Sequence, residues 1–274
     1  MPTPGLSLVG FIDDQQQAIN HLLNACIPAT PDPIILAAEW TAAKAKLGTP
    51  FANSGNPNIQ PIPASHHAYM NQVLAFPVFS AAWPTATIEL VEIDAILAYQ
   101  ITIDNDRSAY HGNTLSNPPT LDELMTMCLP LTPPSENFKV FPGQNSMVLK
   151  AKCLNIRQLQ GLWNQTFMGI QFGVSLPFAH VVRYGGRCYL FNGYHRALCV
   201  RMAGATHIPC VVRDVADHKE VGLNPPDFFS PALLTSNNPP TLGHFTQGRA
   251  HTVSLRQHSR IIHVSWAEHA IPDE

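Results

Sequence analysis

Hydrophobic residues near the start of the chain recur at the spacing of a helix face. One helix is predicted to begin after Asp14, and its apolar positions are Ile19, Leu22, Leu23 and Cys26. A second helix is predicted over residues 34–47, and Gly48 suits its end. Residues 49–65 are rich in Pro, Asn and Gly, so we expect a loop or an arm there.

The middle and the end of the chain mix strand and helix patterns. Apolar and polar residues alternate over residues 87–93, which predicts a strand. Thr120 followed by Glu123 is the pattern of a capping box and predicts a helix over residues 121–128. A helix is also expected over residues 155–167, where the apolar stripe comprises Ile156, Leu159, Leu162 and Trp163. The β-branched residues of 260–266 predict a final strand.

The most informative stretch covers residues 180–214. Gly185-Gly186 separates two β-rich segments and predicts a two-residue hairpin turn. The second of these strands ends at Asn192-Gly193, where the pattern changes to that of a helix. The stretch therefore predicts a hairpin that leads directly into a helix.

The end of this helix is also marked in the sequence. Gly204 lies where a left-handed helix terminator is expected. Residues 208–212 then form the next strand, and Pro209 is tolerated near its start or on a sheet edge. The whole stretch thus predicts a strand–turn–helix–strand unit.

The turn before the helix has the chemistry of an anion site. Gly193 has no side chain, so a ligand can approach the backbone there. The first N–H groups of a helix lack internal partners, and the helix dipole adds partial positive charge. Phosphate is a common ligand of such sites. His195 and Arg196 add donors in the first turn, where positive charge is unfavourable for the helix alone.

A purely structural interpretation stays open at this point. Asn-Gly before a helix is an ordinary turn, and His195 and Arg196 are compatible with a solvated helix face.

The unit resembles the ParB/sulfiredoxin-like superfamily. Members share a strand, a Gly-containing turn ending in His-Arg or Arg-Arg, a helix, and then Gly-x-x-x-Ile-Pro-Val. The matching segments here are Phe191-Asn192-Gly193-Tyr194-His195-Arg196 and Gly204-Ala205-Thr206-His207-Ile208-Pro209-Cys210. Residues 88–96 resemble the opening strand and turn of the family, and Gln100 and Arg107 are similar to the Gln and Arg that follow it. The resemblance covers residues 87–107 and 177–214, less than half of the chain.

The resemblance implies an α/β (α+β) fold, a small mixed sheet with helices, to which this chain adds a helical N-terminal extension and Pro-rich insertions. The expected division is an extension over residues 1–85, a core over 86–216 with an insertion at about 108–176, and a Pro-rich C-terminal segment over 217–274. We expect this last segment to end in a strand packed on the core.

Composition narrows the class of function. Only 13% of the 274 residues are charged and the net charge is −3, which disfavours charge-driven binding of nucleic acid. No run of about 18 apolar residues predicts a membrane span, and the first residues lack the pattern of a secretion signal. The six Cys residues form no C-x-x-C pair, which disfavours zinc and thioredoxin-type sites. Because a secretion signal is not predicted, we expect reduced, mostly buried thiols and a cytoplasmic location.

The resemblance implies a nucleotide at the turn, with ATP, ADP or CTP as the candidates and Mg²⁺ as a counter-ion. The first hypothesis is a nucleotide-dependent phosphotransferase or nucleotide hydrolase that acts on an unknown small molecule or protein. Alternatives are a non-catalytic module that senses a nucleotide or phosphate, and a ParB-like nuclease. Sulfiredoxin chemistry is disfavoured because its catalytic Cys precedes His-Arg, where this chain has Tyr194.

The resemblance also assigns roles to individual residues. The nucleotide phosphates would contact Asn192, Gly193, Tyr194, His195, Arg196 and Arg107. Catalytic roles are assigned to His195 and to two carboxylates, Asp104 and Asp106, in preference to Glu92 and Asp94. A solvated loop is the alternative for Asp104 and Asp106. No protein-held transition metal is predicted, because the 13 His residues form no convergent set.

Overall fold

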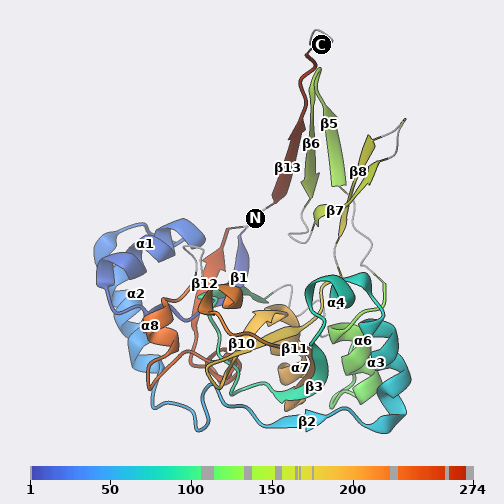
Figure 1. The fold of residues 1–274 in the computed structure, drawn as a ribbon. Helices are drawn as coiled ribbons and strands as arrows, with labels where there is room; N and C mark the ends of the chain where they lie inside the picture. The colour runs from blue at the N-terminus through green and yellow to red at the C-terminus, as the bar shows by residue number, and fades with distance from the viewer. Residues whose placement is uncertain are drawn as a thin grey trace. The chain divides into compact units, whose positions relative to one another are not determined.

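The computed structural model describes residues 2–105, 114–132, 138–151, 156–163, 166, 168–174, 176–222, 228–256 and 259–269. The chain divides into two compact units. The first unit contains residues 1–131 and 178–256, and the second contains residues 132–177 and 257–274. Both units are drawn in Figure 1.

The first unit mixes strands with short helices, which makes it an α+β structure. Its strands are β1 (Thr3–Ser7), β2 (Ile59–Pro61), β3 (Thr87–Glu92), β4 (Thr102–Asp104), β9 (His180–Tyr184), β10 (Arg187–Asn192), β11 (His207–Asp214) and β12 (His251–Leu255). Its α-helices are α1 (Gln15–Ala25), α2 (Pro33–Lys46), α3 (His67–Leu74), α4 (Pro77–Ala82), α6 (Leu121–Cys128), α7 (Tyr194–Met202), α8 (Pro231–Leu234) and α9 (Leu242–Thr246). Its 3-10 turns are η1 (Val9–Phe11), η2 (Ala64–His66) and η3 (His218–Val221).

A five-stranded mixed sheet in the order β10-β9-β11-β3-β2 forms the centre of the first unit. β9 and β10 form an antiparallel hairpin through Gly185 and Gly186, whose φ angles are 57° and 75°. β11 runs parallel to β9 and antiparallel to β3. The predicted hairpin and the predicted strand–turn–helix–strand order are both confirmed.

Pro209 lies inside this sheet without breaking it. β11 pairs with β3 from His207 onward, but its pairing with β9 begins only at Val211. Pro209 therefore occupies the first half of the strand, where the sheet ladder is one-sided and a missing N–H costs least.

A second sheet in the order β12-β1-β4 packs with the N-terminal helices. The pattern of the first residues did not indicate β1, which pairs with both β12 and β4. Figure 1 shows α1 and α2 together beside β1 and β12. Their shared core contains Val9, Ala18, Ile19, Leu22, Cys26, Leu36, Ala43 and Leu255. Residues distant in sequence thus bury a common apolar surface, which is the main favourable contribution to folding.

The helix starts that were predicted from Asp14 and from Thr120 are confirmed. Asp14 accepts from the N–H of Gln17 at the start of α1. The structure adds a cap that was not predicted, since Asp32 accepts from the N–H of Ile34 at the start of α2. Thr120 and Glu123 form both hydrogen bonds of the predicted capping box at the start of α6.

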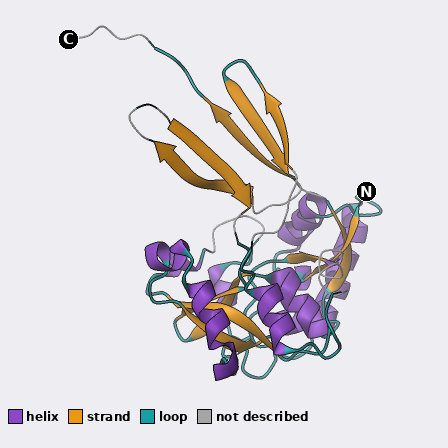
Figure 2. Ribbon diagram, turned by 90° about the vertical axis from the view of Figure 1, so that its right-hand side faces the viewer, coloured by secondary structure: helices purple, strands orange, loops and turns teal. Residues whose placement is uncertain are grey.

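The second unit is built from strands. It contains β5 (Phe138–Pro142), β6 (Ser146–Ala151), β7 (Ile156–Trp163), β8 (Met168–Val174) and β13 (Arg260–Ser265). They form one sheet in the order β13-β6-β5 and a separate hairpin of β7 and β8. Figure 2 shows these strands in orange.

The helix predicted over residues 155–167 is wrong. Residues 156–163 form β7, whose register against β8 shifts between Gln158 and Gln160. Such a bulge interrupts the two-residue alternation of a strand, so the apolar spacing imitates a helix stripe.

Two further strand assignments refine the predictions. The loop expected over residues 49–65 contains β2, which pairs with β3 at the sheet edge. The final strand is present as β13, but it is hydrogen-bonded to β6 rather than to a strand of the first unit. Alternation identifies a strand, whereas the choice of partner depends on contacts across the chain.

Five described cysteines are free thiols and buried, as expected: Cys26, Cys128, Cys188, Cys199 and Cys210. Cys153 lies outside the described residues. Among the described residues, no helix combines the length and the apolar composition needed to cross a membrane.

Candidate functional site

The predicted turn joins β10 to α7 through Gly193. Gly193 is the N-terminal cap of α7 and adopts a left-handed conformation with φ 106° and ψ 18°. A Cβ at this position would lie 3.1 Å from Ala179 Cα and 3.2 Å from Ala179 Cβ. Glycine is required here both by the backbone angle and by the close approach of Ala179.

The first turn of α7 has no negative charge and no side-chain cap. Gly193 cannot cap the helix with a side chain, and no acidic residue is present in the first turn. The residues that follow Gly193 are Tyr194, His195 and Arg196. The partial positive charge of the helix start is therefore increased by the side chains present rather than offset.

Tyr194 connects this turn to the segment that follows β3. Its side chain is buried, and its hydroxyl accepts hydrogen bonds from the N–H groups of Tyr99 (3.0 Å) and Gln100 (3.3 Å). Burial raises the pKa of Tyr194 well above its ordinary value. The Tyr99 hydroxyl in turn donates to the carbonyl of Phe191 at 2.9 Å. The Tyr194 side chain thus holds the turn in place, and only its backbone could contact a ligand.

Arg196 lies half-buried against α6. Burial lowers the pKa of Arg196 from its ordinary value, and the nearby Cys128 thiol acts in the opposite direction. Burial likewise raises the pKa of Cys128 to about 12, against the effect of Arg196. The Arg196 guanidinium therefore lies near Cys128 of α6, in surroundings that hydrate it poorly, and poor hydration strengthens the attraction of a charge for an anion.

The structure places only some of the other predicted site residues at or beside the start of α7. Asn192 is the half-buried last residue of β10, and His195 is half-buried on the first turn of α7. Asp104 ends β4, which packs beside α7. Asp106 and Arg107 lie outside the described residues, so the structure does not place them.

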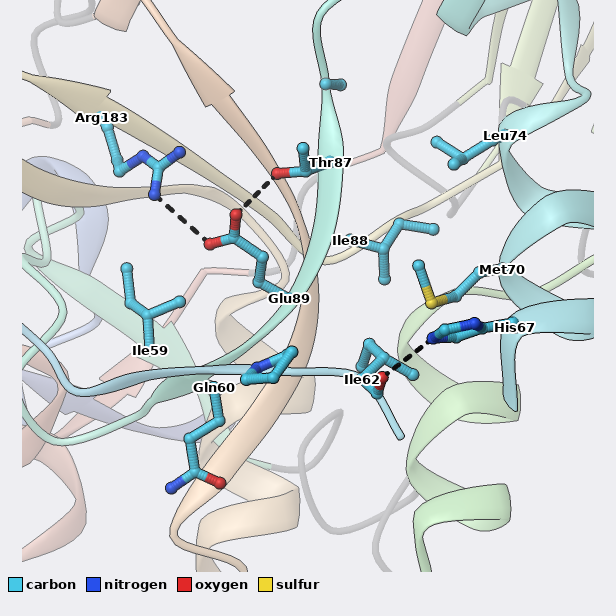
Figure 3. Close-up of a pocket in the computed structure, with 12 residues that line it drawn as sticks. Ile59, Gln60, Ile62, His67, Met70, Leu74, Thr87, Ile88, Glu89 and Arg183 are labelled. Atoms are coloured by element: carbon cyan, nitrogen blue, oxygen red, sulfur yellow. Dashed lines mark hydrogen bonds and ion pairs between the residues drawn. The ribbon is translucent and has the colours of Figure 1, made fainter. Parts of the chain in front are cut away.

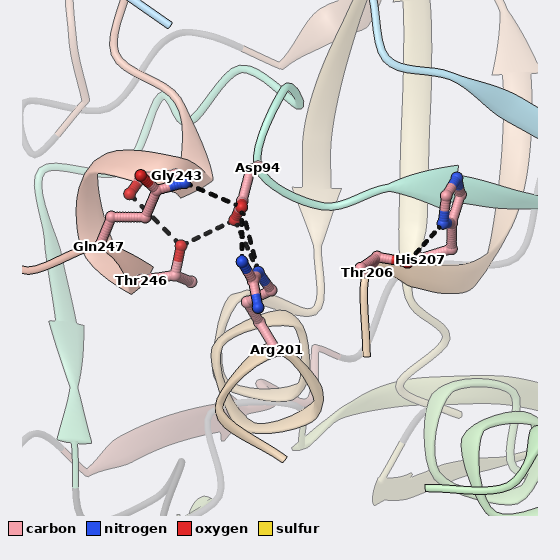
Figure 4. Close-up of polar contacts among 7 residues, drawn as sticks. All are labelled: Asp94, Arg201, Thr206, His207, Gly243, Thr246 and Gln247. Atoms are coloured by element: carbon pink, nitrogen blue, oxygen red, sulfur yellow. Dashed lines mark hydrogen bonds and ion pairs between the residues drawn. The ribbon is translucent and has the colours of Figure 1, made fainter. Parts of the chain in front are cut away.

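Asp94, considered from the sequence as a possible catalytic carboxylate, belongs to a structural network (Figure 4). Its carboxylate accepts from Arg201 at 3.0–3.1 Å, from the Thr246 hydroxyl at 2.8 Å and from the Gln247 amide at 3.0 Å. Burial alone would raise the pKa of Asp94, but these hydrogen bonds lower it below its ordinary value. The network ties α7 and α9 to the end of β3. Glu92 also has a structural partner, the N–H of Asn58 at 2.9 Å.

An aromatic cluster beside the turn was not found from the sequence. The buried His180 ring lies 4.6 Å from the Trp83 ring and 5.0 Å from the Phe191 ring, measured between centroids. Burial, and then the nearby Arg213, lower the pKa of His180 to about 3, so the ring is neutral at physiological pH. Its Nε2 is buried and has no hydrogen-bond partner among the residues that the structure describes. These residues come from four separate segments, so no local sequence signal could have revealed the cluster.

No family model, curated protein or solved structure matches this chain. Within the described part of the chain, no group of three or more His, Cys, Asp or Glu is arranged to hold a metal ion.

Proposed function

We propose that the β10–α7 turn binds the phosphate groups of a nucleoside di- or triphosphate, and that the chain is a nucleotide-dependent phosphotransferase or nucleotide hydrolase. The resemblance of the turn to the ParB/sulfiredoxin-like superfamily supports the choice of a nucleotide. ATP, ADP and CTP are the candidates.

One observation carries this proposal. α7 begins at a left-handed glycine, without a capping side chain or an acidic residue, and its first turn instead contains His195 and Arg196. A helix start that has no side-chain cap and carries added positive charge is unfavourable for the helix alone but suits an anion. The donor set, backbone N–H groups with an imidazole and a guanidinium, matches phosphate oxygens.

Catalysis would depend on positioning and on stabilisation of charge at the transferred phosphoryl group. Asp104 is the candidate carboxylate because β4, which it ends, packs beside α7. Mg²⁺ bound to nucleotide phosphates needs only one or two protein carboxylates, a role that Asp104 could fill.

The second candidate function is a binding module that senses the nucleotide without consuming it. The observation that favours it is the saturation of Asp94, whose carboxylate is held by Arg201, Thr246 and Gln247. A carboxylate with these donors is a weak base and is not available for proton transfer.

The test is a thermal-shift panel of ATP, ADP, CTP, GTP and inorganic phosphate, with and without Mg²⁺. A ligand at about a hundred times its dissociation constant stabilises the fold by about 2.7 kcal/mol. We expect such a shift for one nucleotide with the wild type, and its loss in Arg196→Ala. Arg196→Lys, which keeps the charge but not the fork of donors, should retain part of the shift.

The matched control is Arg256→Ala, because Arg256 is exposed and its guanidinium donates to the Leu23 carbonyl of α1. Its ligand-induced shift should equal that of the wild type. A wild type that none of the ligands stabilises would exclude the proposal. If a nucleotide binds, chromatography of the incubated nucleotide distinguishes the two functions, since only an enzyme releases a product. The Asp104→Asn variant of the enzyme should release that product more slowly than the wild type.

A further inference from the structure

Three polar side chains in hydrogen-bond contact connect the start of α3 to the start of α6. The Ser65 hydroxyl lies 2.9 Å from Nδ1 of His66, and Nε2 of His66 lies 3.0 Å from Oδ1 of Asp122. Ser65 and His66 belong to η2, which continues directly into α3, whereas Asp122 lies in the first turn of α6. A hydroxyl, an imidazole and a carboxylate are thus in contact in the order that nucleophilic catalysis uses.

These contacts determine the roles of the two ring nitrogens of His66. An ionised carboxylate can only accept a hydrogen bond, so the proton of the neutral imidazole is on Nε2, which donates to Asp122. Nδ1 then carries a lone pair and accepts from the Ser65 hydroxyl. His66 is therefore oriented as a general base for Ser65.

The position of Asp122 is held by contacts at both ends of α6. The capping box of Thr120 and Glu123 fixes the first turn of this helix, which contains Asp122. At the other end, the Tyr69 hydroxyl of α3 donates to the carbonyl of Leu129, the C-terminal cap of α6, at 3.0 Å. The two helices, side by side in Figure 1, are thus joined by a second contact that does not involve the three polar side chains.

The site is open to solvent, which restricts its chemistry. Ser65 is exposed, and the exposed fractions of the His66 and Asp122 side chains are 17% and 89%. Water at the site weakens the electrostatic stabilisation of the oxygen anion that forms during acyl transfer. A substrate whose leaving group departs readily needs less of this stabilisation, so the site suits aryl esters better than amides.

We propose that Ser65 as nucleophile, His66 as general base and Asp122 as positioning residue hydrolyse small carboxylic esters with a good leaving group. Ser65 Oγ attacks the carbonyl carbon of the ester while its proton passes to Nδ1 of His66. The bond to the leaving oxygen breaks, that oxygen takes up the proton, and the acyl group stays on Ser65. A water molecule then attacks the acyl carbon and gives its proton to His66, which returns it to Ser65 Oγ as the acid is released.

The proposal goes beyond the phosphate site and uses none of its residues. The test is labelling of the full chain with a fluorophosphonate. Its phosphorus forms a bond to the oxygen of an activated serine, the P–F bond breaks, and fluoride leaves with the serine proton. Mass spectrometry of the digested chain locates the adduct, and release of p-nitrophenolate from p-nitrophenyl acetate measures ester hydrolysis.

We expect the adduct on Ser65 in the wild type, and Ser65→Ala should lose both the adduct and the ester hydrolysis. Ser80→Ala is the matched control, because the exposed Ser80 hydroxyl donates to the Pro77 carbonyl and not to a base. Its labelling and hydrolysis should equal those of the wild type.

His66→Gln should slow the labelling of Ser65 about a hundredfold, a usual contribution of a general base. His67→Gln is the control, since His67 is the next residue but its Nε2 donates to the Ile62 carbonyl at 3.2 Å, as Figure 3 shows. The His67→Gln variant should react at the wild-type rate, which also separates the site from unspecific reaction of the ester with a surface imidazole.

Asp122→Asn should lower the maximal labelling rate less than His66→Gln does. The probe concentration that gives half of this rate should not change, because Asp122 acts only on the imidazole. The proposal is overturned if Ser65 of the wild type is not labelled, or if Ser65→Ala hydrolyses the ester as fast as the wild type. A loss in His67→Gln equal to that in His66→Gln would also refute it, and Asp122→Asn at the wild-type rate would remove Asp122 from the triad.

Discussion

Two neighbouring helices of the first unit, α6 and α7, begin in opposite ways. They pack against each other and against β11. At the start of α6, Glu123 accepts from the N–H and the hydroxyl of Thr120 and from Ser116, so the backbone and side-chain donors there are satisfied locally. These hydrogen bonds, chiefly the one from the Ser116 hydroxyl, lower the pKa of Glu123 to about 2.

α7 begins with none of these features. Its cap is a left-handed Gly193, and positive or neutral donors stand where α6 has acids. The difference shows two uses of a helix start. The start of α6 is completed by its own sequence, whereas the start of α7 is shaped by tertiary contacts to Ala179 and Tyr99 and is chemically suited to an external anion.

The largest effect is expected from Gly193→Ala, because it attacks the backbone geometry of α7 directly. The left-handed angle and the contact with Ala179 should together cost about 2 kcal/mol of the free energy of unfolding. Urea denaturation measures this value. Gly185→Ala is the control, since Gly185 also has a positive φ but a Cβ there would meet nothing within 4 Å. Equal losses in the two variants would mean that the contact with Ala179 does not constrain the turn.

A smaller effect is expected from Thr120→Ala, which removes the cap of α6. The loss of a capping side chain costs about 1 kcal/mol, and the urea midpoint should fall accordingly. Thr41→Ala, in the interior of α2 with its hydroxyl on the Ala37 carbonyl, should change stability by less than about 0.5 kcal/mol. If Thr120→Ala is as stable as the wild type, the capping box does not distinguish α6 from α7.

The smallest effect on stability is expected from His195→Glu. This variant tests the difference between the starts of α6 and α7 most directly. This variant gives α7 an acidic first turn like that of α6, so the ligand-free protein should gain roughly 0.5 kcal/mol from the helix dipole at pH 8. The same charge repels phosphate, so the nucleotide-induced thermal shift should disappear.

Met202→Glu is the matched control for that variant. Met202 is 64% exposed in the last turn of α7, where a negative charge opposes the dipole. Its ligand-free stability should therefore fall slightly, while the nucleotide-induced shift persists. A His195→Glu variant that still responds to the nucleotide would place the phosphate elsewhere.

Much of the local structure could be predicted from the sequence. The Gly185-Gly186 hairpin, the helix after Gly193 and the capping box of Thr120 depend on interactions between residues close in the chain. The prediction of a helix over residues 155–167 was wrong, because the bulge in β7 gives a strand the apolar spacing of a helix. The partner of β13 could not be predicted either, because alternation does not specify which edge a strand joins.

The sequence by itself determined that a glycine turn with His195 and Arg196 would open a helix after a strand, because turn and helix signals are short-range. Only the tertiary structure decided that the Tyr194 side chain is buried under Tyr99 and that Asp94 is bound to Arg201. It also decided that Glu89 shares Arg183 with Asp214. These pairs lie 31 to 107 positions apart in the sequence, so their burial and charge balance exist only once the chain has folded.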